Sequence, residues 1–328
     1  MPNLELSIAI GDYDRTRPLV DGTARIDGVD PVFMLLEPEE IFFRAFRHAE
    51  FDLCELSLSS FSVRTARGDN PYVGVPVFPS RAFRHTAISV RTDRILTPQD
   101  LKGKTIGVPE YQLTACVWGR AILEEHGVSP ADVAWVRGGL EQPGRVEKIA
   151  LNLPAEVRIS SIPADRTLSA MLEAGEIDAI LSPRIPSCQE RGAPNVGWLF
   201  PDTAAVAADY FRRTGIFPIM HVLGVRKELA QAHPWLPAAA LKGFTQAKAV
   251  AMAKLADTSA SKVTLPFVEE RLAAARTLMG DDFWSYGLEK NRGVLEAFLG
   301  HHYSQGLSPR RLSVDELFHP ATHETAKI

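Results

Sequence analysis

The fold is decided by the stretch Thr97-Pro98-Gln99-Asp100-Leu101-Lys102-Gly103-Lys104-Thr105-Ile106-Gly107-Val108. Thr97 is an N-cap candidate with Asp100 three residues later, and a glycine-containing turn then leads into the apolar run Thr105–Val108. This run is a strand candidate that follows an earlier group of strands. The chain therefore enters a second sheet here.

On both sides of this stretch, short apolar runs bounded by Gly, Pro and Asp alternate with helical patterns. That alternation is typical of βαβ units and mostly parallel sheets, so we predict an α/β protein. We expect strands at 4–10, 32–36, 51–56, 72–76, 86–90, 133–137, 179–181 and 216–226, and helices at 18–21, 39–49, 114–126 and 168–174.

The last third of the chain, from Pro234, has an almost wholly helical pattern. We expect helices at 235–256, 268–278 and 292–305 that pack on the first lobe. Strand 216–226 is expected to carry the chain back to that lobe. The predicted division is 1–84 with 227–328 in lobe 1 and 85–226 in lobe 2, with the ligand between the lobes.

Composition excludes several classes of function. The net charge of −4, with mixed signs along the chain, provides no basic field for nucleic acid. The three cysteines, Cys54, Cys116 and Cys188, form no C-x-x-C pair, which favours a reducing compartment. The sequence enters its first strand pattern at once and contains no apolar run long enough for a membrane helix. We therefore expect a cytoplasmic protein without membrane or nucleic-acid partners.

Two segments, Asp100–Val108 and Leu172–Ile180, resemble the second lobe of type II periplasmic binding proteins. More specific similarity lies in Phe51–Ser57, Arg81–His85, Pro109–Ala115, Gly138–Arg145, Ile216–His221, His233–Trp235 and Tyr286–Arg292. Through these segments the chain resembles the 4,5-dihydroxyphthalate decarboxylase family over nearly its full length. The resemblance implies a two-lobed fold with a helical C-terminal part, a homo-oligomer, and the non-oxidative conversion of 4,5-dihydroxyphthalate to 3,4-dihydroxybenzoate in phthalate degradation.

That reaction places defined demands on a site. Direct loss of CO2 leaves an aryl carbanion whose lone pair lies in the ring plane, where the ring cannot delocalise it. Protonation of the ring carbon, with the para hydroxyl deprotonated or polarised, gives instead a dienone that loses CO2 readily. The site needs an acid near that carbon, a base near the para oxygen, and cations for the retained carboxylate.

Arginines are concentrated just beyond the expected strand ends, where ligands bind in open α/β sheets. Guanidinium groups bind carboxylates bidentately, so this supply suits a dicarboxylate. Any one of them could equally be a surface fork or salt bridge. The positions are Arg15, Arg17, Arg81, Arg84, Arg137 and Arg184.

Two histidines, His85 and His221, are the candidate proton donors, because the ordinary pKa of a histidine, ~6.5, is close to working pH. The competing interpretation is a hinge histidine bonded to a backbone carbonyl. Glu55, Asp14 and Glu110 follow strands and are candidates for the hydroxyl-side base or for hydrogen bonds to the catechol. Loop carboxylates also often cap helices, so that role stays open for each of them.

The helix expected from residue 114 has Tyr111, Gln112 and Thr114 at its start, where free N–H groups and the helix dipole favour an anion. Thr114 could instead be a plain N-cap. Ser57, at the end of the strand that carries Glu55, completes the candidate substrate-binding set.

The resulting hypothesis is a metal-independent, cofactor-free decarboxylase of a small aromatic dicarboxylate, whose lobes close over the substrate. His301-His302 and His319 with His323 lack nearby ligands at metal spacing, so we predict no metal site. Two alternatives remain open. One is a solute-binding receptor for an aromatic or dicarboxylic acid. The other is a different cytoplasmic enzyme on the same fold, similar to the menaquinone-pathway enzymes.

Overall fold

A computed structural model describes residues 3–323 of the chain. The chain divides into two compact units. Unit 1 contains the chain up to Arg81, Ile219–Glu296 and the chain from Leu312, and unit 2 contains Ala82–Pro218 and Ala297–Arg311. This division differs from the expected one at three places. Residues 82–84 and 297–311 belong to unit 2, and the strand from His221 joins the first sheet, so residues 219–226 belong to unit 1.

Unit 1 is built on a five-stranded sheet in the order β2-β1-β3-β11-β4. β1 is parallel to β2 and β3, whereas β11 runs antiparallel to both β3 and β4. The start of β11 therefore lies at the carboxyl end of β3, with His221 opposite Ser57. The strands are β1 Leu4–Ile10, β2 Val29–Leu35, β3 Leu53–Ser57, β4 Tyr72–Val75 and β11 His221–Arg226.

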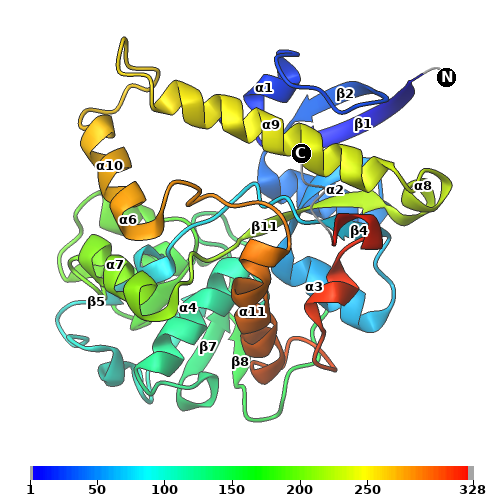
Figure 1. The fold of residues 1–328 in the computed structure, drawn as a ribbon. Coiled ribbons are helices and arrows are strands. Elements are labelled where there is room, and N and C mark those ends of the chain that lie inside the picture. Colours follow the sequence, from blue (N-terminus) through cyan, green and yellow to red (C-terminus); the bar gives the residue numbers. More distant parts are fainter. Residues whose placement is uncertain (1–2, 324–328) are drawn as a thin grey trace. The chain divides into compact units, whose positions relative to one another are not determined.

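Helices cover this sheet. α2, Pro38–His48, carries acidic residues in its first turn and buries Ile41, Phe42 and Phe46, as its sequence predicts. Phe43, which the sequence also places on the apolar side, is 41% exposed. α9 lies across the unit beside α1 and β4 (Figure 1). The other helices are α1 Arg17–Val20, α3 Leu58–Arg67, α8 Lys227–Ala232, α9 Leu236–Leu255 and α10 Val268–Met279, with short 3-10 turns at Glu289–Asn291, Val314–Leu317 and Pro320–Thr322.

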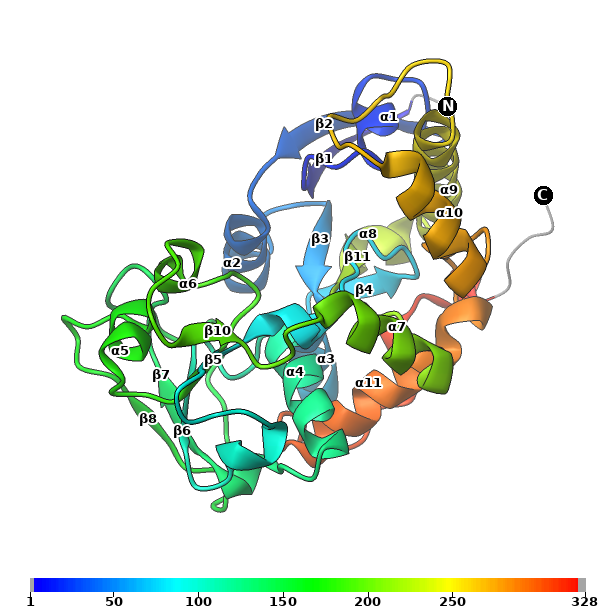
Figure 2. The ribbon, with the colours of Figure 1, turned by 90° about the vertical axis from the view of Figure 1, so that its left-hand side faces the viewer.

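Unit 2 contains a six-stranded sheet in the order β10-β5-β9-β6-β7-β8. β6, β7, β8 and β9 are parallel, and β5 is antiparallel to β9 and β10. Figure 2 shows these strands with α4 and α5 nearby. The strands are β5 Ile88–Arg91, β6 Thr105–Val108, β7 Ala134–Arg137, β8 Ile159–Ser161, β9 Ala179–Leu181 and β10 Val196–Trp198.

The helices of unit 2 are α4 Thr114–Glu125, α5 Leu168–Ala174, α6 Ser187–Glu190 and α7 Thr203–Thr214, with 3-10 turns at Arg84–Ala87, Pro98–Leu101 and Pro130–Asp132. The turn at Pro98 has the expected capping box between Thr97 and Asp100. α4 begins at Thr114 with Leu113 as its N-cap residue, so Thr114 is not the cap. α11, Arg292–Ser304, begins in unit 1 and ends in unit 2.

The expected strand 216–226 begins five residues late, at His221, because residues 216–218 form no ladder with β3. Pro218 has no N–H to donate to such a ladder. The helices α3 and α7 were not predicted, since both contain serine or alanine where apolar residues would mark a helical face. Among the described residues, no helix is both long and apolar enough to cross a membrane.

Candidate active site

Glu55 and His221 form a hydrogen-bonded pair at the carboxyl end of β3. The Glu55 Oε1 atom lies 2.5 Å from His221 Nδ1, and the Glu55 side chain is fully buried. Glu55 faces Leu223 across the ladder, so His221, two residues earlier on β11, lies diagonally on the same face of the sheet. Two residues that are 166 positions apart in the sequence are joined in this way.

The Glu55 carboxylate accepts two further hydrogen bonds. The Tyr13 hydroxyl donates to Oε1 at 3.0 Å, and the Gly11 N–H donates to Oε2 at 3.0 Å. Burial alone would raise the pKa of Glu55, but the bonds from His221, Gly11 and Tyr13 outweigh it, so this pKa lies below its ordinary value. Burial, followed by the negative charge of Glu55, raises the pKa of Tyr13 above its ordinary value. At neutral pH Glu55 is therefore an ionised carboxylate and Tyr13 a protonated phenol.

The ionised Glu55 can only accept hydrogen bonds, so the Nδ1 atom of His221 must donate. This fixes the imidazole and leaves its Nε2 atom for other chemistry. Nε2 makes no hydrogen bond within residues 3–323, and the His221 side chain is 17% exposed. The ring of Phe42 packs edge-on against the imidazole at 4.8 Å. His221 therefore presents one oriented nitrogen to an incoming molecule.

A stacked arginine adjoins this pair. The Arg15 guanidinium lies over the Tyr13 ring at 4.3 Å and over the Trp284 ring at 4.4 Å. Its Nε donates to the Pro79 carbonyl at 2.5 Å, and its Nη1 donates to Asp14 at 3.1 Å. Contact with two aromatic rings restricts the movement of the guanidinium, which suits recognition of a carboxylate. Tyr13 contacts both Glu55 and Arg15, so it links the Glu55–His221 pair to this guanidinium.

The other predicted residues of unit 1 have different surroundings. Asp14 is 58% exposed and bonds to the N–H and Nη1 of Arg15. Ser57 is buried at the end of β3, opposite His221. Arg81 is buried and donates to the Ser285 carbonyl at 2.8 Å and to the Asn291 side chain. These bonds give Arg81 a role in holding the segment around Ser285, and burial lowers its pKa to about 10.

In unit 2, the Glu110 carboxylate is bound by two cations. Arg145 donates to Oε1 through Nε at 2.9 Å and Nη2 at 2.6 Å, and Lys148 donates through Nζ at 2.6 Å. The backbone N–H of Lys148 donates to Oε2 at 3.0 Å. These donors occupy both oxygens of the buried carboxylate. These contacts favour a structural role for Glu110.

The expected anion site at the start of α4 is in contact with a carboxylate of the chain itself. Glu147 Oε1 accepts a 2.6 Å hydrogen bond from the Tyr111 N–H. Burial raises the pKa of Glu147 to about 6, and the charge of Glu110 adds to this effect. Gln112 and Thr114 are both buried, and the Gln112 amide reaches Glu110 at 3.4 Å. The backbone N–H of Tyr111, just before α4, thus binds a carboxylate, which is the kind of anion that the start of a helix favours.

His85 lies in an aromatic cluster of unit 2. Its ring packs edge-on against Phe200 and Tyr210, each at 5.4 Å. Burial lowers the pKa of His85 to about 4, and the nearby His126 contributes in the same direction, so the imidazole is neutral at pH 7. These surroundings favour packing over proton donation.

Four predicted arginines remain. Arg84 is half-buried and its pKa is lowered by burial, whereas Arg184 is exposed. Arg17 is exposed and pairs with Asp12, and Arg137 donates to the Ser161 hydroxyl at 3.0 Å.

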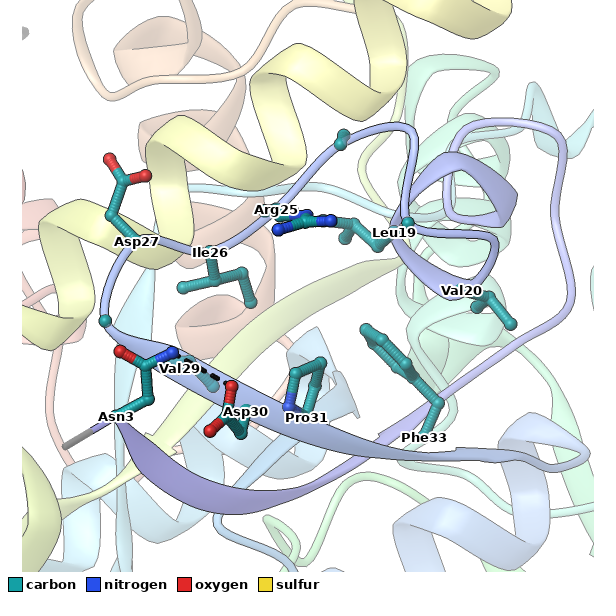
Figure 3. A pocket seen from close by; sticks show the side chains of 13 residues that line it. Asn3, Leu19, Val20, Arg25, Ile26, Asp27, Val29, Asp30, Pro31 and Phe33 are labelled. Atoms are coloured by element: carbon teal, nitrogen blue, oxygen red, sulfur yellow. Dashed lines mark hydrogen bonds between the residues drawn. The ribbon is translucent and has the colours of Figure 1, made fainter.

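A cavity of about 440 Å³ lies elsewhere in unit 1, along the edge strand β2 (Figure 3). Its labelled lining includes Leu19, Arg25, Ile26 and Phe33, and none of the predicted catalytic residues. The Glu55–His221 pair therefore does not line this cavity. Within residues 3–323, no three His, Cys, Asp or Glu side chains are placed to hold a metal ion together.

Sequence reasoning did not identify Tyr13 and Trp284 as site residues. Tyr13 lies only two residues before Arg15, yet nothing in its spacing indicates a bond to Glu55. Trp284 contacts Arg15 from a segment more than 260 residues later in the chain, which no local pattern predicts.

The comparisons with known proteins are consistent at the level of fold. No protein-family model matches the chain. The alkanesulfonate-binding protein SsuA from Xanthomonas axonopodis pv. citri matches with a TM-score of 0.53 and 16% identity, covering 98% of both chains. The periplasmic aliphatic sulphonate binding protein SsuA from Escherichia coli also gives a TM-score of 0.53 at 16% identity, covering 99% of this chain and 94% of its own. The predicted periplasmic-binding-protein-like fold is thereby confirmed.

The similarity to curated enzymes is much greater. The 4,5-dihydroxyphthalate decarboxylase of Comamonas testosteroni is 60% identical over 330 residues, which is 100% of both chains. The 4,5-dihydroxyphthalate decarboxylase of Pseudomonas putida is 62% identical over 214 residues, covering 65% of this chain and 83% of its own. Identity at this level over the full length leaves no doubt about ancestry: the chain belongs to the 4,5-dihydroxyphthalate decarboxylase family.

Proposed function

We propose that the protein is a carboxy-lyase that converts 4,5-dihydroxyphthalate to 3,4-dihydroxybenzoate and CO2. Two enzymes named for this activity are 60% and 62% identical to the chain. The observation that carries the proposal is the Glu55–His221 pair beside the stacked Arg15 guanidinium. Together they provide an oriented proton donor and a cation, which are two of the three groups that the reaction needs.

The chemistry proceeds through a dearomatised ring. His221 Nε2, in the imidazolium form, gives its proton to the ring carbon that bears the leaving carboxylate, while the para hydroxyl releases its proton to solvent. The intermediate is a dienone with a tetrahedral carbon that carries both hydrogen and carboxylate. The C–C bond then breaks, its electron pair restores the aromatic ring as a phenolate, and CO2 leaves. The phenolate and His221 each regain a proton from water.

Each residue of the pair has a distinct role in this scheme. Glu55 contacts no reacting atom and is a positioning residue, because it fixes the Nδ1 proton and stabilises the imidazolium by a charge-assisted bond. Arg15 binds the carboxylate that the substrate keeps. Aromatic stacking on Tyr13 and Trp284 reduces the loss of side-chain freedom when that carboxylate binds.

A direct assay tests the activity. The purified protein is mixed with 4,5-dihydroxyphthalate, with and without a chelator, and CO2 release and ring absorbance are followed. We expect turnover in both cases, and a loss of ~10²–10⁴-fold in kcat for His221→Asn, the usual contribution of a general acid. His48→Asn, at an exposed histidine in α2 of the same unit, is the control and should leave kcat unchanged.

Three outcomes are informative. Turnover that requires an added metal ion would contradict the cofactor-free scheme. Tight binding of the substrate without turnover would favour the receptor alternative. A His221→Asn variant with the kcat of the wild type would remove His221 from the mechanism. A cytoplasmic location and a homo-oligomeric state remain predictions of the sequence, to be checked by cell fractionation and by light scattering.

A further inference from the structure

Tyr286 is a buried tyrosine whose hydroxyl is not used by the fold. Its side chain lies in unit 1 and the residue is only 7% exposed. The hydroxyl oxygen is buried and has no hydrogen-bond partner within residues 3–323. By contrast, the buried Tyr72 of the same unit donates its hydroxyl to the Phe51 carbonyl at 3.0 Å. Burying a polar group without a partner costs free energy, so phenylalanine would serve packing better at position 286.

The segment that carries Tyr286 is bound on both sides. Before it, the Trp284 indole N–H donates to the Phe78 carbonyl at 3.0 Å, and the Lys248 Nζ donates to the Trp284 carbonyl at 2.9 Å. After it, the Gly287 N–H donates to the Pro76 carbonyl at 2.8 Å, and the Asn291 amide donates to the Gly287 carbonyl at 2.8 Å. These bonds hold the backbone in place on both sides of the phenol.

The same segment also holds Arg15. Trp284, two residues before Tyr286, stacks on the Arg15 guanidinium at 4.4 Å. Burial raises the pKa of Tyr286 above its ordinary value, and the positive charges of Arg15 and Arg81 act in the opposite direction. The phenol therefore keeps its proton at neutral pH. A neutral donor and a cation in one region suit an anion that accepts from both.

We propose that the Tyr286 hydroxyl donates a hydrogen bond to the carboxylate that the substrate keeps, alongside the Arg15 guanidinium. This inference rests on the proposed function, because it assigns a further residue to the same site. Arg15 has a free Nη2 among the described residues, since its Nε and Nη1 bond to Pro79 and Asp14. Tyr286 and Arg15 then act together as the group that selects an aromatic ring with a carboxylate at this position.

Binding measurements separate this role from catalysis. Wild type, Tyr286→Phe and the control Tyr72→Phe are titrated calorimetrically with phthalate, with 3,4-dihydroxybenzoate and with catechol. The first two ligands carry the carboxylate in question, and catechol carries none. We expect Tyr286→Phe to bind both acids about 10- to 100-fold more weakly and catechol equally well, the usual loss for a hydrogen bond to a charged group.

Thermal unfolding supplies a second readout. Tyr72→Phe loses a hydrogen bond of the fold, so its Tm should fall by about 2 °C while its binding stays unchanged. Tyr286→Phe loses no such bond, so its Tm should stay the same or rise. A purely structural role for Tyr286 predicts the reverse, with a lower Tm and unchanged binding, and that result would overturn the proposal.

Two further results would overturn the proposal. One is that Tyr286→Phe binds all three ligands more weakly by the same factor. The other is that the wild type binds neither acid. The outcome for the proposed function is independent. A wild type that binds phthalate more tightly than Tyr286→Phe does, yet releases no CO2 from 4,5-dihydroxyphthalate, supports the assignment of Tyr286 and contradicts the decarboxylase activity.

Discussion

Replacement of Glu55 by glutamine tests whether the buried carboxylate acts through His221. The carboxylate is fully buried and accepts from His221 at 2.5 Å, from Tyr13 at 3.0 Å and from the Gly11 N–H at 3.0 Å. The amide of glutamine keeps one acceptor oxygen. If this oxygen faces His221 and Tyr13, the NH2 group faces the Gly11 N–H, and two donors meet. If the oxygen faces Gly11 instead, the NH2 group faces the donating Nδ1 of His221. At least one bond is lost in either orientation.

The size of the effect follows from these contacts. Loss of one buried hydrogen bond lowers the free energy of unfolding by ~1–3 kcal/mol. Loss of the negative charge removes a charge-assisted bond to the imidazolium of ~1.5–3 kcal/mol, so kcat should fall roughly 10- to 150-fold. KM should change little, because Glu55 contacts no substrate atom in this scheme. Urea unfolding measures the first quantity, and steady-state kinetics with 4,5-dihydroxyphthalate measures the second.

The double variant provides the strictest test. If Glu55 acts only through His221, the variant with both Glu55→Gln and His221→Asn should have the kcat of His221→Asn alone, because residues that act as a unit are not additive. Multiplicative losses in the double variant would refute this reasoning, and so would a Glu55→Gln enzyme with unchanged kcat. Glu50→Gln, at an exposed carboxylate bonded to Arg44, is the matched control and should leave kcat unchanged.

Three other variants have defined expectations. Arg15→Lys keeps the charge but loses the planar fork stacked on two rings, so steady-state kinetics should show a KM raised about 10-fold. Glu147→Gln should raise the free energy of unfolding at pH 7 by up to ~2 kcal/mol. The pKa of Glu147 is raised from 4.5 to about 6, so the wild type loses stability as pH rises through that range. Equal stability of both proteins at pH 7 would contradict this expectation. The pKa of His85 is lowered from 6.5 to about 4, so as pH falls the unfolded chain takes up the proton first and the wild type loses stability between pH 6.5 and 4. This loss of stability should be smaller in His85→Leu. Melting curves across this range check the sign, and a steeper loss in His85→Leu would disprove it.

Local patterns were sufficient for much of the sheet architecture. The run Leu4–Ile10 alternates apolar and polar residues and is β1 with the same bounds, and the apolar run Ala179–Leu181 is β9. The side-chain period predicts β1, and the short apolar run predicts β9. α3 was missed because Leu58–Arg67 contains four hydroxyl residues, whose helical state depends on burial in unit 1 and not on propensity.

The candidate site was predicted in part, and the division has a physical basis. Strand ends bring Glu55 and His221 to one edge of the sheet, so topology alone makes both of them candidates. The state of each group depends on its partners, which sequence does not provide. Glu55 lies inside β3, whereas Glu110 lies two residues beyond β6, where its carboxylate is bound by Arg145 and Lys148. His85 lies in the 3-10 turn just before β5, whereas His221 is the first residue of β11, and burial among aromatic neighbours keeps His85 neutral.

The position of β11 has a consequence for synthesis of the protein on the ribosome. β11 pairs with β3 on one side and β4 on the other, so the first 81 residues contain four strands of the sheet but cannot close it. Until residue 226 has left the exit tunnel, the facing edges of β3 and β4 lack their partner and are open to pairing with other chains. Nascent chains that end before His221 are therefore expected to lack the proposed proton donor and also to aggregate. Holdase chaperones should associate with them during translation of residues 82–218.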